Sequence, residues 1–308
     1  MLGKEFPSVY LECPLLDQPY LDVTVLYGEL DPGVRVESPL AGEHAAMFDW
    51  FTPIRAEDDS VTCGFELDTK NETIPTAAVH FQPRGRTEPV RPFCEAVDEP
   101  DRADLYLSQA ARMPDGWPLS FFGMFRGRPG SPLRVCGYIP ESEVQACADD
   151  FRYLAGVFET VGFSAYDDAM LKQVSALMAV APEQVDFQFD VYPDGSLGNV
   201  FAIDVMFGIK QPEVVCEVFA SGAGAQVMGL LESWGAADGR WKLGADAAFA
   251  RALPVQFDDG EIGRYAFTLM PQWVKARWTD TVLQPSKLYS FANGSVVGKS
   301  DQSSEMVG

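Results

Sequence analysis

Several segments of the chain alternate between apolar and polar residues, which is the period of a β-strand with one buried face and one polar face. The clearest are 185–192 and 200–207. Their apolar positions include Phe187, Phe189, Phe201, Ile203 and Val205, and the positions between them include Asp186, Gln188, Asp190, Tyr192, Ala202 and Asp204. The connection PDGSLGN is rich in residues that tolerate left-handed backbone conformations, so it predicts a hairpin turn.

The same pattern recurs as pairs of strands followed by helices. Strands are predicted at 20–27, 61–68, 76–83, 118–128, 131–140, 183–192, 200–208, 264–278 and 285–291. Helical periodicity predicts helices within 41–51, 88–113, 142–163, 167–180, 212–234 and 244–253. Proline at position 100 is expected to break the second of these helices.

The two faces of the strands restrict the fold class. Helices are expected to cover the apolar faces. The polar faces then meet solvent in an open α+β sheet, or they enclose a polar lumen in a closed barrel. About ten antiparallel strands are many for an open twisted sheet, and closure removes the exposed edges. We therefore expect an α+β fold with an antiparallel β-barrel of about ten strands, a polar lumen and surrounding helices.

Length and charge narrow the organisation and the partners. We expect residues 1–292 to form a single barrel domain and residues 293–308, which lack apolar periodicity, to be a disordered tail. The net charge of -22 repels polyanions, so neither nucleic acid nor an anionic membrane surface is an expected partner. Neither a membrane-spanning run nor the apolar core of a signal peptide is evident, which favours a cytoplasmic protein without membrane insertion.

Basic residues in the last predicted strand pair stand out against this acidic background. Alternation places Trp273, Lys275 and Arg277 on one face of the first strand, and Lys287 and Tyr289 on one face of the second. Basic residues on an exposed strand are commonly solvated or protect a sheet edge. In a barrel the same faces would point into the lumen, where cations and a phenol stabilise a polyanion such as a diphosphate.

Three short segments resemble one known family. In CGFELDTKNETIPTAAVHFQP, Glu66 lies in a strand that is followed by a polar connection and a second strand ending near a proline. SKLYSF has Lys287 and Tyr289 separated by one residue, and LRVCGYIP is a looser version with Arg134 and Tyr138. Together with the repeated strand–strand–helix order, these segments resemble the ABBA-fold (PT-barrel) aromatic prenyltransferases over about residues 55–292. The chain length is similar to that of members that modify peptides or small phenols.

The resemblance implies a transferase that moves a prenyl group from an allylic diphosphate to an aromatic or peptide side-chain acceptor inside the lumen. Glu66 would take or hold the proton of the acceptor. The diphosphate would be bound by Arg134, Lys275, Arg277, Lys287 and Tyr289. The allylic cation and the acceptor would be contacted by Tyr138, Tyr192 and Trp273.

The strand pair at 183–208 departs from the family pattern. It offers Asp186, Asp190 and Asp204 where the family has basic residues and tyrosines. A Mg²⁺ ion bridging carboxylates and diphosphate would account for this, although nothing in the sequence requires a cofactor. Asp186 and Asp190 lie ~13 Å apart along one strand, so Asp204 would have to approach one of them.

Plainer interpretations stay open for the remaining residues. His80 is expected to be a hydrogen-bonded histidine, and Arg126 and Arg128 are expected in a solvated loop. The chain has no GxGxxG after a strand, no GxxxxGK[ST], no GxSxG and no HExxH, which removes the common templates for nucleotide-dependent enzymes, hydrolases and metalloproteases. The alternative to an enzyme is a non-catalytic α+β domain that binds a peptide or a small ligand.

Overall fold

The structure is a computed structural model that describes residues 8–18, 20–27, 45–57, 61–67, 78–256 and 262–299. Its strands are β1 (Ser8–Pro14), β2 (Asp22–Leu26), β3 (Thr62–Leu67), β4 (Ala78–Gln82), β5 (Leu119–Met124), β6 (Leu133–Ile139), β7 (Val185–Val191), β8 (Leu197–Met206), β9 (Phe249–Gln256), β10 (Ile262–Thr279), β11 (Val282–Leu283) and β12 (Lys287–Lys299). Its helices are α1 (Ala45–Glu57), α2 (Val90–Ala96), α3 (Asp101–Ala110), α4 (Glu141–Asp149), α5 (Phe151–Val161), α6 (Asp168–Ala179), α7 (Val215–Ala220), α8 (Ala223–Ser233) and α9 (Trp241–Asp246), with a 3₁₀ turn at Pro212–Val214.

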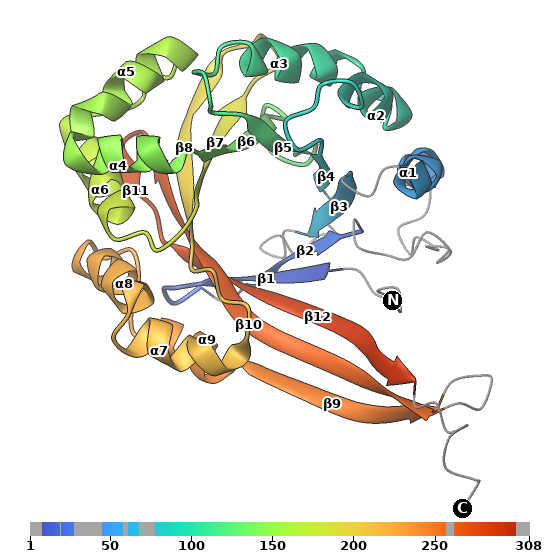
Figure 1. Cartoon of the computed structure of the whole chain (residues 1–308). Helices are drawn as coiled ribbons and strands as arrows, with labels where there is room; N and C mark the ends of the chain where they lie inside the picture. The colour runs from blue at the N-terminus through green and yellow to red at the C-terminus, as the bar shows by residue number, and fades with distance from the viewer. Residues whose placement is uncertain are drawn as a thin grey trace, which may run out of the picture.

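Ten of the strands form a closed antiparallel barrel (Figure 1). Their order around the barrel is β10-β12-β1-β2-β3-β4-β5-β6-β7-β8, and β8 pairs with β10 to complete the ring. Residues 273–279 of β10 make this closing contact with residues 200–206 of β8. The sequence-based expectation of an antiparallel barrel with helices around it is confirmed.

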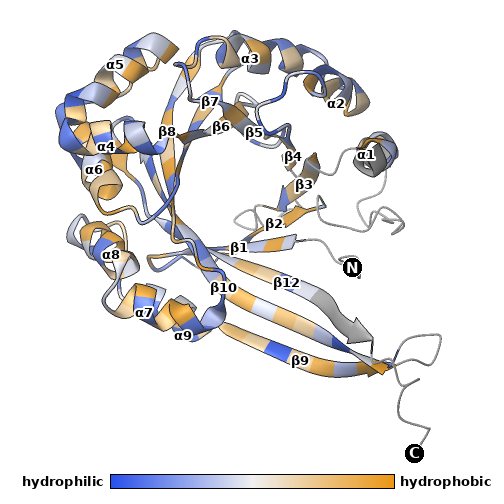
Figure 2. Cartoon of the chain, viewed as in Figure 1, coloured by the Kyte–Doolittle hydropathy of each residue, from blue (hydrophilic) through white to orange (hydrophobic). Residues whose placement is uncertain are grey.

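The helices lie outside the ring of strands and cover its apolar outer face (Figures 1 and 2). Phe158 of α5 packs against Phe189 and Phe201, with ring centroids 6.0 and 4.8 Å apart. Asp150 and Asp167 cap the starts of α5 and α6 by accepting backbone N–H hydrogen bonds. Because these faces turn outward, the alternating polar residues turn into the lumen.

Part of β10 leaves the barrel. Its first half pairs with β9 on one side and with β12 on the other, and these three strands form a ribbon that projects from the ring (Figure 1). The pairing with β12 shifts register between Pro271 and Trp273, where the missing N–H of proline suits a bulge. The register shift lies between the ribbon and the residues that close the barrel.

Three expectations about the elements are corrected. The helix expected at 244–253 ends at Asp246, and β9 begins at Phe249 because it pairs with the far half of β10. The helix expected at 142–163 is broken at Asp150. Residues 293–299, expected in a disordered tail, belong to β12, which pairs with β10 as far as Lys299, and residues 300–308 lie outside the described part of the chain.

The helices were compared with the length and apolar composition of a membrane span. Within the described ranges, only α7 and α8 taken together, with the turn before them and with a bend of 50° between them, have the length and apolar composition of a membrane span, and no single helix does.

Candidate functional site

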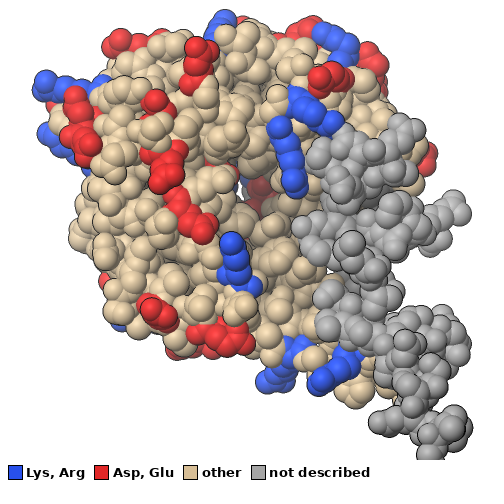
Figure 3. All heavy atoms as spheres, in the orientation of Figure 1, with Lys and Arg blue, Asp and Glu red and all other residues tan. Residues whose placement is uncertain are grey.

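Two adjoining cavities occupy the lumen of the barrel. The arginine cavity, of about 310 Å³, is named for Arg128, Arg134 and Arg277 in its lining, and the aspartate cavity, of about 480 Å³, for Asp186 and Asp204. Both are lined by Glu12, Glu66, Arg134, Gln188, Lys275 and Tyr289. Figure 3 shows a hollow at the centre of the face seen along the barrel, with acidic atoms visible inside it.

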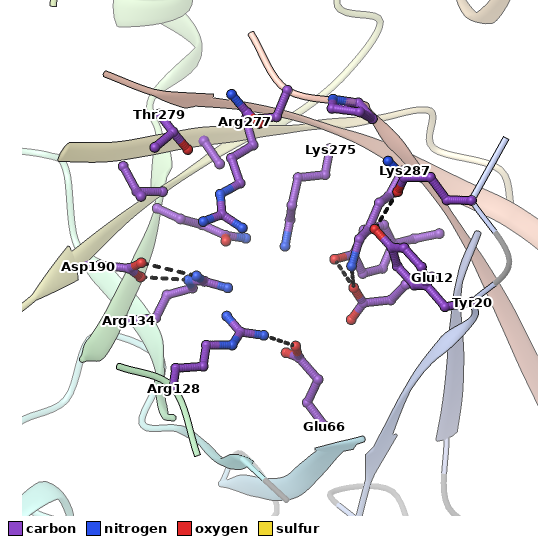
Figure 4. Close-up of a pocket in the computed structure, with 17 residues that line it drawn as sticks. Glu12, Tyr20, Glu66, Arg128, Arg134, Asp190, Lys275, Arg277, Thr279 and Lys287 are labelled. Atoms are coloured by element: carbon purple, nitrogen blue, oxygen red, sulfur yellow. Dashed lines mark hydrogen bonds and ion pairs between the residues drawn. The ribbon is translucent and has the colours of Figure 1, made fainter. Parts of the chain in front are cut away.

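Strands from opposite sides of the barrel bring cations into the arginine cavity (Figure 4). The cations are Arg128 after β5, Arg134 on β6, Lys275 and Arg277 on β10, and Lys287 on β12. The pairing of β6 with β7 sets Arg134 beside Asp190, and Nε and Nη2 of the arginine donate to the two carboxylate oxygens at 2.9 and 3.2 Å. Burial raises the pKa of Asp190, but the charge and the hydrogen bonds of Arg134 outweigh burial and lower it.

Lys287 is held by two carboxylates. Its Nζ lies 3.1 Å from Oε2 of Glu12 and 2.5 Å from Oδ2 of Asp22. Burial lowers the pKa of Lys287, but the two negative charges outweigh burial and raise it. The Tyr289 hydroxyl donates to Glu12 at 2.6 Å, so its proton is already engaged. Lys287 and Tyr289 both line the cavity as expected, but their polar groups already bind Glu12 and Asp22.

Arg277 has no comparable partner. Among the described residues, no carboxylate forms an ion pair with it, and its Nε is buried without a hydrogen-bond acceptor. Burial and the positive charge of neighbouring Arg134 lower its pKa, while Asp190 acts in the opposite direction. Figure 4 shows its guanidinium pointing toward Arg134. A buried donor without an acceptor calls for an explanation, and an anionic ligand in the cavity supplies one.

Glu66 lies on β3 and joins the two cavities. Its Oε1 accepts a hydrogen bond from Arg128 at 2.9 Å, and its Oε2 lies 3.1 Å from Nε2 of His80. Burial alone would raise the pKa of Glu66, but the hydrogen bond of His80 and the charges of His80, Arg128 and Arg134 hold it well below its ordinary value. His80 is the hydrogen-bonded histidine that we expected. The expectation of a solvated Arg128 is wrong, because its side chain reaches the lumen.

Asp186 and Asp204 face each other across β7 and β8. Gln184 donates to Oδ1 of Asp186, and Gln188 donates to Oδ2 of Asp204, both at 2.5 Å. Burial is the main cause that raises the pKa of Asp186 to about 7 and that of Asp204 to about 6. Lys275 lies 3.8 Å from Oδ1 of Asp204 and lowers the pKa of that carboxyl only in part.

Aromatic rings form another wall of the aspartate cavity. Trp273 stacks on Tyr289 with ring centroids 4.8 Å apart and lies 4.9 Å from Tyr10. Tyr138 is 41% exposed and lies at the rim. Tyr192 was expected to contact the allylic cation or the acceptor in the lumen, but it lines neither cavity. Its ring lies against Gly130 and Gly198. Tyr192 follows β7, which ends at Val191, so the alternation of the strand does not determine the direction of its side chain.

The three aspartates do not fit a shared Mg²⁺ site. Asp190 lines only the arginine cavity and is bound by Arg134, whereas Asp186 and Asp204 line only the aspartate cavity. In the described part of the chain, no group of three or more His, Cys, Asp or Glu side chains is arranged to hold a metal ion.

Sequence reasoning missed the acidic residues that bind Lys287. Glu12 lies on β1, a strand that the sequence did not predict, and Asp22 begins β2. A signal for β1 was present, because Tyr10 and Glu12 alternate with Val9 and Leu11.

No protein-family model matches the chain, and no curated protein is similar to it.

Proposed function

We propose that the protein transfers a prenyl group from an allylic diphosphate to an acceptor bound in the same lumen, as the resemblance to ABBA-fold prenyltransferases implies. The observation that carries the proposal is the buried Nε of Arg277, which has no hydrogen-bond acceptor among the described residues, in a cavity that Arg128 and Arg134 also line. A diphosphate would supply the acceptor oxygens that Arg277 lacks. The antiparallel barrel with external helices supports the family assignment at the level of architecture.

The chemistry requires stabilisation of the leaving group. When the carbon–oxygen bond of an allylic diphosphate breaks, negative charge grows on the departing oxygens, and fixed cations in a water-poor lumen stabilise it. Arg277 and Lys275 are the cations that we assign to this contact, since Lys287 is bound by Glu12 and Asp22. Arg134 and Arg128 contribute charge while they keep their carboxylate partners.

Aromatic side chains next to the cations would protect the allylic cation from water. Lys275 lies 4.8 Å from the ring centroid of Tyr289, and Trp273 stacks on the same ring. Ring faces attract cations, so a carbocation formed here gains stabilisation as well as shielding. Glu66, which is ionised because of its low pKa, stabilises positive charge on the acceptor and is a weak proton acceptor.

Donor binding and turnover test the proposal separately. Calorimetric titration with inorganic diphosphate and with an unreactive thio-diphosphate analogue of the prenyl donor measures the first. Replacing Arg277 by Ala should weaken the affinity for each of these two ligands by about ten- to a hundredfold, the range that corresponds to a charged hydrogen bond of ~1.5–3 kcal/mol. Arg112→Ala, at an exposed position, is the matched control and should bind both with wild-type affinity.

Turnover is measured by mass spectrometry after incubation with dimethylallyl or geranyl diphosphate, aromatic small molecules and short peptides. A prenylated product that is lost in Arg277→Ala supports the transfer. Tight binding without product across the panel would support the alternative, a ligand-binding barrel without catalysis. Equal diphosphate affinity in wild type and Arg277→Ala would contradict the proposal that Arg277 binds the diphosphate of the donor.

A further inference from the structure

The charges in the lumen are divided between the two cavities. The charged side chains that line only the arginine cavity are Arg128, Arg277, Lys287 and Asp190. Those that line only the aspartate cavity are Asp186, Asp204 and Arg84, and Arg84 is exposed. Besides Glu12, Glu66, Arg134 and Lys275, which line both cavities, cations prevail in the arginine cavity and carboxylates in the aspartate cavity.

The two carboxylates of the aspartate cavity have unused acceptor capacity. Each accepts one hydrogen bond from a glutamine, Asp186 from Gln184 and Asp204 from Gln188. Oδ1 of Asp204, a residue only 4% exposed, receives no hydrogen bond from the described residues. Lys275 lies 3.8 Å from this oxygen, beyond hydrogen-bond distance. Arg134 also lines this cavity, but it is bound to Asp190, so the nearest cation to the two aspartates is one lysine and a second positive charge can be accommodated.

The rest of the cavity suits an organic cation. Trp273 is in ring contact with both Tyr10 and Tyr289, and all three line this cavity. Their faces attract ammonium and guanidinium groups. A neutral phenol in the same place would not compensate a carboxylate charge, so the aspartates would stay charged at a cost or take up a proton.

We infer that the aspartate cavity binds a cationic nitrogen group of the acceptor, an ammonium or a guanidinium, between the carboxylates of Asp186 and Asp204 and beside the ring of Trp273. That this group belongs to the acceptor of a prenyl transfer rests on the proposed function, whereas its binding in the cavity does not. In the transfer, the nitrogen gives one proton to an aspartate carboxylate, and its freed lone pair forms the bond to the allylic carbon. The carbon–oxygen bond of the donor breaks, and its electron pair leaves on the diphosphate in the arginine cavity.

Titration with matched peptides tests the inference without any prenyl donor. The probes are acetylated and amidated Ala-Xaa-Ala peptides in which Xaa is arginine, lysine, citrulline or norleucine. About 0.5 M salt is used because the net charge of -22 attracts any cation, and salt screens that long-range attraction. We expect the arginine or the lysine peptide to bind at least tenfold more tightly than its neutral counterpart, and their ranking identifies the group. Equal binding of charged and neutral peptides overturns the inference.

Variants locate the binding. Asp186→Asn and Asp204→Asn preserve size and shape, and each should reduce the preference for the cationic peptide about tenfold. Asp115→Asn, at an exposed position, controls for the loss of one negative charge and should keep the preference. An unchanged preference in the folded double variant of Asp186 and Asp204 overturns the site. The wild-type comparison between charged and neutral peptides stands whether or not a variant folds.

Turnover separates this inference from the proposed function. A preference for cationic peptides that depends on Asp186 and Asp204 supports the inference even in a protein that transfers no prenyl group. Prenylation of a neutral phenol, with no product from the arginine and lysine peptides, supports the proposed transfer and overturns the cationic acceptor.

Discussion

Arg134 and Asp190 form a two-point ion pair across β6 and β7, in the wall of the arginine cavity. Their side chains are only 10% and 8% exposed. In such a buried pair, removal of one partner leaves a charge without compensation, which typically costs about 3–5 kcal/mol. The pair therefore holds the cavity wall together as well as contributing charge to it.

Replacing Asp190 by Ala should lower the free energy of unfolding by about 3–5 kcal/mol because Arg134 stays buried and charged. Urea denaturation measures the change. Asp115→Ala, at an exposed position, is the control and should stay within about 0.5 kcal/mol of wild type. If Asp190→Ala and the control lose equal stability, the ion pair makes no special contribution to the fold.

The alternation of residues predicted the direction of most lumen residues, and together with the number of predicted strands it favoured the barrel. Phe187 and Phe189 face the helices, while Asp186, Gln188 and Asp190 face the cavities, because the period of two is a local property of each strand. The same rule failed at Tyr192, which lies beyond the end of β7 at Val191 and lines neither cavity.

The ion pairs of the site could not be predicted in the same way. Glu12 and Lys287 are 275 positions apart and meet because β1 pairs with β12, a neighbour relation that closure of the barrel creates. Arg128 follows β5 in what the sequence presents as a loop, yet it reaches Glu66, 62 positions away. Local patterns indicate the face of a strand, whereas partners depend on the strand order.

Replacing Lys287 by Ala should destabilise the fold more than it weakens donor binding. The substitution leaves Glu12 and Asp22 buried without their cation, and the cost should reach about 3 kcal/mol. Affinity for inorganic diphosphate should fall less than in Arg277→Ala, since the charge of Lys287 is already compensated. Denaturation and diphosphate titration, with exposed Lys210→Ala as control, measure both effects. A larger loss of affinity in Lys287→Ala than in Arg277→Ala contradicts this division.

Stability should depend on pH through the two aspartates of the aspartate cavity. Their folded-state pKa values, about 7 for Asp186 and about 6 for Asp204, lie above the ordinary value of 3.8. A carboxyl with a raised pKa contributes stability that is complete below pH ~4 and is lost as pH rises through the folded-state value. The free energy of unfolding should therefore decrease from pH 5 to pH 8.

Asp186→Asn is the test of this dependence. The variant should lose less stability over the same range, by up to about 3 kcal/mol, because it has no carboxyl to ionise at that position. Glu66 and Asp190 have lowered pKa values and lose their contribution only in more acidic solution, outside the window. Identical pH profiles for wild type and Asp186→Asn would show that Asp186 ionises without cost.

Replacing Glu66 by Gln should separate electrostatics from proton transfer. Because the pKa of Glu66 is held well below its ordinary value, the substitution removes a full negative charge from the border of the arginine cavity and frees Arg128. Affinity for an unreactive donor analogue should stay equal or rise. Turnover in a protein that transfers prenyl groups should still fall by ~10²-fold, since the positive charge on the acceptor loses its carboxylate. Titration and single-turnover rates, measured on the same preparation, give the two results, and weaker donor binding in Glu66→Gln would place Glu66 in the donor site instead.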